Sequence, residues 1–391
     1  MNRKTLFFLA AVVAAISSWA SAGDLKPCAC DPAEAGMSSM SNGVDYGEQF
    51  TKPPEGAGMV HPGVVIATLA GPGKVKVAVD SAKADAKAPD TVRFDFTGEG
   101  KFSDAFSTPL KVVERPGNLH GTFGPATFDV RNGDKAVKVS VVGDYTNMGP
   151  GYHILAVAMT CAAEGSCDFG GKSYKVRLLN GRRNFKLGDA SKVEAGGMIA
   201  GDVLLVDTGD GTFTKDVTMS FLDQPVILGG KTYAVTVNDD ASRIQAAEVD
   251  VPMGMVRIDR AQWSATFIGK KYHSTVNGND TPVSLPADAY TITNYTEKGE
   301  GKSQLMIRQV TGTVEVAAGK TVDIKIGEPL TVALSIQQSN GTVVFNLGCT
   351  DVSGSPIATL INAEGAIPPP PKFTVSDSSG KQVYQASLTY G

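Results

Sequence analysis

The sequence is poor in charge and has no long apolar run beyond its first residues. Only 19% of the 391 residues are charged, and Lys and Arg (36) are outnumbered by Asp and Glu (40). This acidic balance argues against nucleic acid as a partner, because nucleic-acid-binding proteins need a positively charged surface. No window after residue 22 is long and apolar enough to cross a bilayer, which takes about 20 residues of helix. We therefore expect no transmembrane segment.

Motifs of well-known enzyme chemistries are also missing. The chain has no Gly-x-Ser-x-Gly nucleophile elbow, no phosphate-binding loop and no zinc-binding helix motif. It has no Cys-x-x-Cys pair, and no histidine has another His or Cys at a metal-ligand spacing. The sequence therefore predicts no catalytic residue and no cofactor-binding residue. It leans towards a non-enzymatic role, although it leaves enzymatic activity open.

Sustained helical periodicity is absent, and a two-residue alternation takes its place. Apolar residues alternate with others in many short stretches, among them Val92–Phe96, Val137–Val142 and Tyr174–Leu179. The 44 glycines and 21 prolines separate these stretches with turns. One or two helical turns are expected only at residues 82–88, which Pro89 ends. The pattern predicts an all-β chain of about twenty strands in two or three antiparallel β-sandwich domains.

The N-terminus has the three parts of an export signal. Basic Arg3 and Lys4 precede an apolar run from Leu6 to Ile16, and Ala20-Ser21-Ala22 supplies the small residues of a cleavage site. We expect cleavage after Ala22 and then a flexible leader over residues 23–62, because this stretch lacks a periodic pattern. The mature protein would then be periplasmic, at the cell surface or extracellular.

Five cysteines lie in a chain that export would place in an oxidising compartment. Cys161 and Cys167 flank Ala-Ala-Glu-Gly-Ser, a sequence that suits a turn between two strands. We therefore predict a disulfide between Cys161 and Cys167 that closes a small loop. Cys28 and Cys30 are too close in sequence to bond well to each other, and either can pair with Cys349. The odd number leaves at least one thiol free or intermolecular.

Two stretches resemble a known class of proteins. The first is Asp202–Phe213 (DVLLVDTGDGTF) followed by Gly229–Tyr233 (GGKTY). The second runs from Leu285–Tyr290 (LPADAY) to the final VYQASLTYG. Together they are similar to uncharacterised exported bacterial proteins built from immunoglobulin-like or carboxypeptidase-regulatory-like β-sandwiches. A Leu-Pro-Ala-Gly-x-Tyr phrase marks the turn into a core strand in such domains, and here Asp288 replaces its glycine.

The resemblance covers residues 170–391 and implies a fold class and an exported setting, but no catalytic residues. With it, the chain after the leader divides into three expected regions. Residues 63–168 would form a β-sandwich-like domain, and residues 169–252 a β-rich domain that is separate from it or continuous with it. Residues 253–391 would form an immunoglobulin-like or carboxypeptidase-regulatory-like β-sandwich region.

One acidic loop suggests two kinds of chemistry. Val206-Asp207-Thr208-Gly209 is similar to the catalytic motif of aspartic proteases, but that chemistry needs two carboxylates that share a proton and the motif occurs once. The same loop suggests a calcium site. The ion takes about six to eight oxygen ligands, and Asp207, Asp210 and Asp216 could supply some of them. The EF-hand spacing is absent, so a plain β-turn stands beside the calcium hypothesis.

Trp263 is the aromatic residue most relevant to ligand binding. It shares one face of an alternating strand with Ala265 and Phe267, which predicts a core position, whereas an exposed Trp263 would suit sugar stacking. The expected function is a non-enzymatic structural or interaction role in the cell envelope or extracellular space, with a protein or glycan at the cell surface as partner. The alternatives are a carbohydrate- or calcium-binding module and a carboxylate-dependent hydrolase that uses Asp207-Thr208-Gly209.

Overall fold

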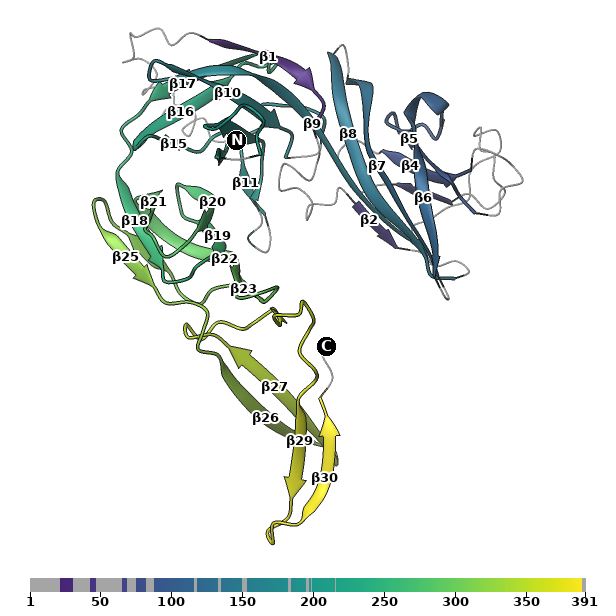
Figure 1. Cartoon of the computed structure of the whole chain (residues 1–391), viewed down its shortest axis with the longest axis vertical. Coiled ribbons are helices and arrows are strands. Elements are labelled where there is room, and N and C mark those ends of the chain that lie inside the picture. The colour runs from purple at the N-terminus through teal and green to yellow at the C-terminus, as the bar shows by residue number, and fades with distance from the viewer. Residues whose placement is uncertain are drawn as a thin grey trace. The chain divides into compact units, whose positions relative to one another are not determined.

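The computed structural model describes residues 22–30, 43–46, 65–68, 75–81, 88–115, 118–132, 135–149, 153–181, 184–194, 197, 199–214 and 216–388. Within these residues the chain is all-β, as predicted: thirty strands accompany one short 3-10 helix, η3 (Asp104–Phe106), and no α-helix (Figure 1). The expected signal sequence and the expected helical turns lie outside the described residues, apart from Ala22 and Ala88 at their ends. Most of the expected leader lies outside them too.

The chain forms two compact units. Unit 1 comprises residues 1–194 and 198–249, and unit 2 comprises residues 195–197 and 250–391. Unit 1 thus contains the whole of the first expected region and most of the second, and the strand β9 (His153–Phe169) runs through the boundary expected at residue 168.

Unit 1 is built around a 15-stranded antiparallel sheet. Eleven strands follow the order β15-β16-β17-β1-β9-β8-β7-β6-β5-β4-β3, while β2, β10, β13 and β14 branch from this path. In chain order its strands are β1 (Gly23–Cys28), β2 (Gly43–Tyr46), β3 (Val65–Thr68), β4 (Lys76–Asp80), β5 (Thr91–Asp95), β6 (Ser107–Arg115), β7 (Asn118–Asn132), β8 (Lys135–Asn147), β9 (His153–Phe169), β10 (Lys172–Leu179), β13 (Val203–Asp207), β14 (Val217–Phe221), β15 (Val226–Leu228), β16 (Lys231–Val237) and β17 (Arg243–Glu248). The short strands β11 (Lys192–Val193) and β12 (Ile199–Ala200) pair with each other.

Part of the expected leader is ordered, so the flexible leader over residues 23–62 was wrong for its first residues. Strand β1 pairs antiparallel with β9 and with β17, and Leu25 is buried in the core. Strand β2 also pairs with β9. The sequence did not indicate these strands, because β1 (GDLKPC) has one large apolar residue and β2 has only four residues.

The predicted disulfide between Cys161 and Cys167 is wrong. Both residues lie on the single continuous strand β9, and their thiols are free. Six residues of strand place the two Cα atoms roughly 20 Å apart, whereas a disulfide needs about 4.4–6.8 Å. The sequence between them does not turn. Residues 162–166 continue the strand and pair with β10, with Gly165 opposite Val176.

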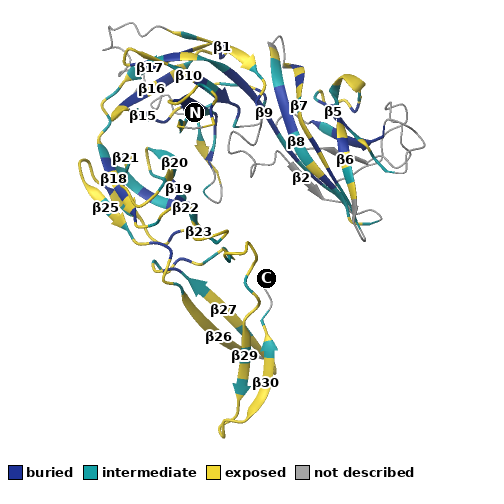
Figure 2. Ribbon diagram, viewed as in Figure 1, coloured by how far each residue is buried: buried dark blue, intermediate teal, exposed yellow. Residues whose placement is uncertain are grey.

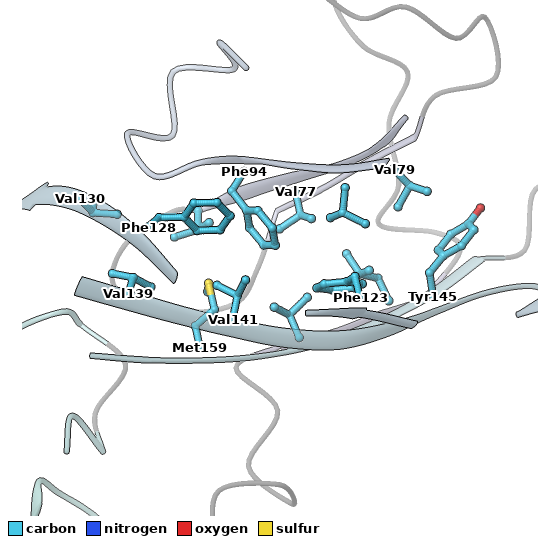
Figure 3. Packing of buried hydrophobic residues seen from close by; sticks show 14 of the residues in the cluster. Val77, Val79, Phe94, Phe123, Phe128, Val130, Val139, Val141, Tyr145 and Met159 are labelled. Atoms are coloured by element: carbon cyan, nitrogen blue, oxygen red, sulfur yellow. The ribbon is translucent and has the colours of Figure 1, made fainter. Parts of the chain in front are cut away.

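Two large apolar clusters stabilise unit 1. The first is rich in aromatic residues, and the rings of Phe94 and Phe128 lie 5.6 Å apart, centroid to centroid (Figure 3). The second includes Phe169 and Tyr233, whose rings meet edge to face at 5.3 Å. Leu187 packs against both clusters, so the two halves of the sheet share a contact through the loop after β10.

Unit 2 contains a 3-stranded and a 6-stranded sheet and two hairpins. The sheets have the orders β21-β18-β25 and β20-β19-β22-β23-β28, with β24 beside β22. All these pairs are antiparallel except β18 with β25. The strands are β18 (Met253–Ile258), β19 (Trp263–Ile268), β20 (His273–Gly278), β21 (Val283–Pro286), β22 (Asp288–Lys298), β23 (Gln304–Gln309), β24 (Val314–Val316), β25 (Thr321–Ile324), β26 (Thr331–Ser339), β27 (Thr342–Thr350), β28 (Thr359–Ile361), β29 (Lys372–Ser376) and β30 (Gln382–Ser387).

The core of unit 2 draws side chains from both sheets. Val256 and Leu285 come from the 3-stranded sheet, and Phe267 and Tyr290 from the 6-stranded sheet. Trp263 is only 3% exposed and belongs to the same cluster, so its predicted core position is confirmed. Figure 2 shows this buried centre, and the exposed hairpins β26–β27 and β29–β30 beyond it in the same unit.

Candidate functional site

The acidic loop between β13 and β14 holds all three residues of the predicted calcium or protease site. The two strands pair antiparallel, with Val203 opposite Phe221 and Asp207 opposite Val217. Asp207 is therefore the last residue of one strand, and Asp216 immediately precedes the other. Asp210 lies between them at the exposed end of the loop.

The carboxylate of Asp207 is occupied by the loop itself. Its Oδ1 accepts hydrogen bonds from the N–H groups of Gly209 (2.9 Å) and Gly211 (3.0 Å). Its Oδ2 accepts one from the N–H of Phe213 (2.6 Å), whose side chain is buried. A carboxylate of this kind fixes the course of a loop by replacing water at three backbone donors. Asp207 is itself only 5% exposed.

The hydrogen bonds of Asp207 are those of a structural carboxylate. Burial alone would raise the pKa of Asp207, but the N–H groups of Phe213, Gly211 and Gly209 outweigh it and hold this pKa below its usual range. An aspartic-protease dyad needs two carboxyl groups that share one proton. Both oxygens of Asp207 instead accept hydrogen bonds from backbone N–H groups of its own loop.

The other two aspartates do not join Asp207 around a common point. Asp210 Oδ1 accepts hydrogen bonds from the N–H (3.0 Å) and the hydroxyl (2.5 Å) of Thr212, which lower the pKa of Asp210. Asp216 stands at a positive φ of 52° and accepts the N–H of Thr208 through its backbone oxygen (2.9 Å). No group of three His, Cys, Asp or Glu side chains among the described residues is placed to hold a metal ion.

A second loop of the same construction follows β5, and the sequence analysis missed it. Asp95 ends this strand and is buried; its Oδ1 accepts the N–H groups of Thr97 (2.9 Å) and Gly98 (3.1 Å). Its Oδ2 accepts the N–H of Gly100 (2.6 Å). The signal was present in the sequence: Gly98-Glu99-Gly100-Lys101-Phe102 repeats the pattern of Gly209-Asp210-Gly211-Thr212-Phe213, each after a strand that ends in Asp.

The strands around the two loops repeat as well. The trio β4–β5–β6 places Lys76 opposite Asp95, and the trio β10–β13–β14 places Lys175 opposite Asp207. Lys175 Nζ donates to the carbonyl oxygen of Gly211 (3.0 Å). Both trios are antiparallel throughout. Each trio also has an equivalent backbone hydrogen bond just outside its middle strand. The N–H of Leu110 donates to the oxygen of Asp90 (2.8 Å), and the N–H of Leu222 donates to the oxygen of Asp202 (2.9 Å).

Asp202 is the buried carboxylate with the most unusual titration. Burial raises its pKa to about 6, although N–H groups of Asp189, Gly181 and Gly188 act in the opposite direction. Those three donors lie 2.7–3.0 Å from its oxygens, and the side-chain amide of Asn180 lies at 3.2 Å. A shifted carboxyl group can mark an active site, but Asp202 is fully buried and connects the loop of residues 180–189 to β13.

Three cavities in the described part of the chain have none of these carboxylates in their lining. A cavity of about 330 Å³ in unit 1 is lined mainly by apolar residues, with Lys186, Asp239 and Asp240 around it, and none of Asp95, Asp202 and Asp207 lines it. In unit 2 a hollow includes Trp263, whose ring is buried and whose Nε1 donates to the Asn279 oxygen (2.8 Å). Trp263 is therefore not a surface for sugar stacking.

Compared with protein families, curated proteins and solved structures, the chain matches none. In the part of the chain that the structure describes, no helix has the length and apolar character to span a membrane.

Proposed function

We propose that this chain is an exported, non-enzymatic protein with a structural or interaction role in the cell envelope or extracellular space. One observation carries the proposal: the two acidic loops, at Asp95 and Asp207, use their carboxylates to bind their own backbone. Carboxylates in this state stabilise strand ends and are withdrawn from hydrolysis and from metal binding. The N-terminal pattern of charge, apolar run and small residues supports the exported setting.

The finer fold that we propose is an immunoglobulin-like or carboxypeptidase-regulatory-like β-sandwich, which the shared core of unit 2 supports. Val256 and Leu285 from one sheet and Phe267 and Tyr290 from the other belong to a single apolar cluster. Two sheets packed face to face give a common core of this kind. Such folds present their loops at the surface, where contacts with a protein or glycan partner would lie.

A ligand and activity screen tests the role. We expect the full chain to bind no sugar on a glycan array, with or without calcium, to show no calcium-dependent change in melting temperature, and to have no activity in protease and glycosidase screens. A calcium-induced rise in melting temperature that Asp207→Asn abolishes would establish a calcium module instead. Hydrolysis that the same substitution abolishes, with Asp210→Asn as its control, would establish the hydrolase.

A further inference from the structure

The hairpin of β26 and β27 in unit 2 has one face composed mostly of apolar side chains. Its nine residue pairs run from Thr331–Thr350 to Ser339–Thr342. Because successive side chains on a strand point to opposite faces, most of the large apolar residues lie on one face of the hairpin. They are Val332, Leu334 and Ile336 on β26, and Val343, Phe345, Leu347 and Cys349 on β27, with Gln338 as the polar member of this face. The opposite face carries Ser335 and Asn346 together with Ala333 and Val344.

This apolar face is largely uncovered. Val332 and Ile336 are each 61% exposed and Leu334 is 46% exposed. The hairpin β29–β30 covers part of the face, where the rings of Phe345 and Phe373 lie 4.4 Å apart, yet both hairpins remain mostly exposed (Figure 2). A two-stranded hairpin is marginally stable in water unless further strands or a packed face support it. The structure therefore contains a folded element that lacks its expected cover.

The outer edge of β26 is also open. Among the described strands β26 pairs with β27 alone, so the backbone groups on its other side have no strand partner. Natural edge strands are protected by charged residues, proline or bulges. None of these occurs in β26, and its register with β27 is regular over all nine pairs. The edge of β27 is less open, because the N–H of Ile357 donates to the oxygen of Cys349 (2.9 Å).

We propose that β26 is a self-association edge, along which the hairpin pairs antiparallel with β26 of a second copy of this chain. The charge distribution favours a second copy, since a two-fold axis brings identical residues together and like charges there repel. The chain carries a net charge of −4, but Leu330–Thr350 contains no charged residue at all. The four-stranded sheet that results joins the two apolar faces, so Val332, Leu334 and Ile336 gain cross-strand neighbours.

This inference rests on the proposed interaction role and names one partner for it. The two can fail separately. A chain that stays monomeric would overturn the self-association and leave the non-enzymatic role intact, whereas hydrolysis or calcium binding through Asp207 would overturn that role without changing the measured oligomeric state.

Sedimentation equilibrium of the full chain over a wide concentration range tests the proposal. We expect a reversible monomer–dimer equilibrium. Leu334→Lys places like charges near the two-fold axis and should weaken the dimer by at least about tenfold. The matched control is Asn346→Lys, an exposed position on the opposite face of β27, which should leave the dimer unchanged. A monomeric wild type, or equal effects of the two lysines, would overturn the proposal.

Hydrogen exchange of the wild type provides a measurement that does not depend on a variant's folding. On raising the concentration from monomer to dimer, we expect slower exchange of amides in β26 and little change in β27. Dimerisation without added protection in β26 would place the interface elsewhere and refute the proposed edge. A chain that remains monomeric but binds phosphatidylcholine vesicles would refute it too, and would assign the apolar face to a lipid surface.

Discussion

Several aspartates among the described residues serve as acceptors for backbone N–H groups. Asp95 and Asp207 each bind three such groups in their own loops. In unit 2, Asp288 accepts the N–H groups of Lys271, Tyr272 and Ala289, and Asp351 binds those of Gly327, Ser353 and Ser355. Asp288 thereby ties the turn before β20 to the start of β22.

Replacing Asp207 tests this role. Asp207→Asn substitutes an NH₂ group for one acceptor oxygen and leaves a buried N–H without a partner, which costs about 1–3 kcal/mol of the free energy of unfolding. Asp210→Asn is the control, because Asp210 is exposed and its side chain binds Thr212 beside it, so this substitution should cost much less than Asp207→Asn. Urea unfolding at neutral pH measures both. Equal effects of the two substitutions would contradict the structural role of Asp207.

The same residue predicts a pH dependence. The folded-state pKa of Asp207 lies below its usual range, so its carboxylate stabilises the fold above the unfolded-state pKa of about 3.9. This contribution disappears as the pH falls through the lower folded-state pKa. The stability difference between wild type and Asp207→Asn should therefore shrink between about pH 7 and about pH 3. A difference that stays constant over this range would show that ionisation of Asp207 is not involved.

Gly278 gives a prediction for packing. A Cβ at this position in β20 would lie 2.2 Å from Cζ2 of the buried Trp263 ring, so Gly278→Ala should cost about 1–3 kcal/mol of unfolding free energy. Gly348→Ala in β27 is the matched control, since the nearest atom to its Cβ is the Ala333 oxygen at 3.9 Å. Chemical denaturation compares the two. If Gly348→Ala were as costly, strand glycine itself and not contact with Trp263 would be responsible.

At the scale of the element, alternation was a sufficient guide to most strands. Val92–Phe96 and Val137–Val142 were predicted from their period of two. The first overlaps β5 and extends one residue beyond it, and the second lies within β8. The same rule failed where tertiary pairing decides. Strand β1 (GDLKPC) has Leu25 as its one large apolar residue and so shows no alternation. Residues 162–166 look like a turn but continue β9, because β1 and β10 supply partners on both sides.

The candidate site was predictable in position but not in chemistry. Asp207, Asp210 and Asp216 do lie on one loop between two strands, as their spacing indicated. The direction of the carboxylate could not be read from the sequence, because it depends on Gly209, Gly211 and Phe213 turning their N–H groups inward. The shared Gly-x-Gly-x-Phe pattern after Asp95 and after Asp207 would have indicated that the loop structure is repeated.

The course of β9 makes a prediction about the thiols. After denaturation and alkylation without reduction, the tryptic peptide of residues 139–172 should contain no bond between Cys161 and Cys167. Its mass should be that of two separately labelled thiols, equal to the mass from a fully reduced sample carried in parallel. A peptide two hydrogens lighter and without label would contradict a continuous strand through Ala162–Ser166.

At the scale of the whole molecule, the two units have separate cores and should unfold in separate transitions. The chain has two tryptophans, Trp19 in the expected signal and Trp263 in unit 2, so tryptophan fluorescence of the mature protein reports unit 2. Asp207→Asn should therefore lower a transition seen by circular dichroism and leave the fluorescence midpoint unchanged. Gly278→Ala should lower the fluorescence midpoint. A shift of both signals by each substitution would show that the units unfold together.

Strand β9 has a mechanical consequence for unit 1. Its 17 residues pair with β8 and β2 in the first half and with β10 and β1 in the second. The same strand contributes side chains to both apolar clusters. Unfolding of either half would remove the partners of half of this strand and so weaken its pairing in the other half. In an optical trap, unit 1 should therefore rupture in a single event, whereas two successive ruptures would show that β9 does not couple its halves.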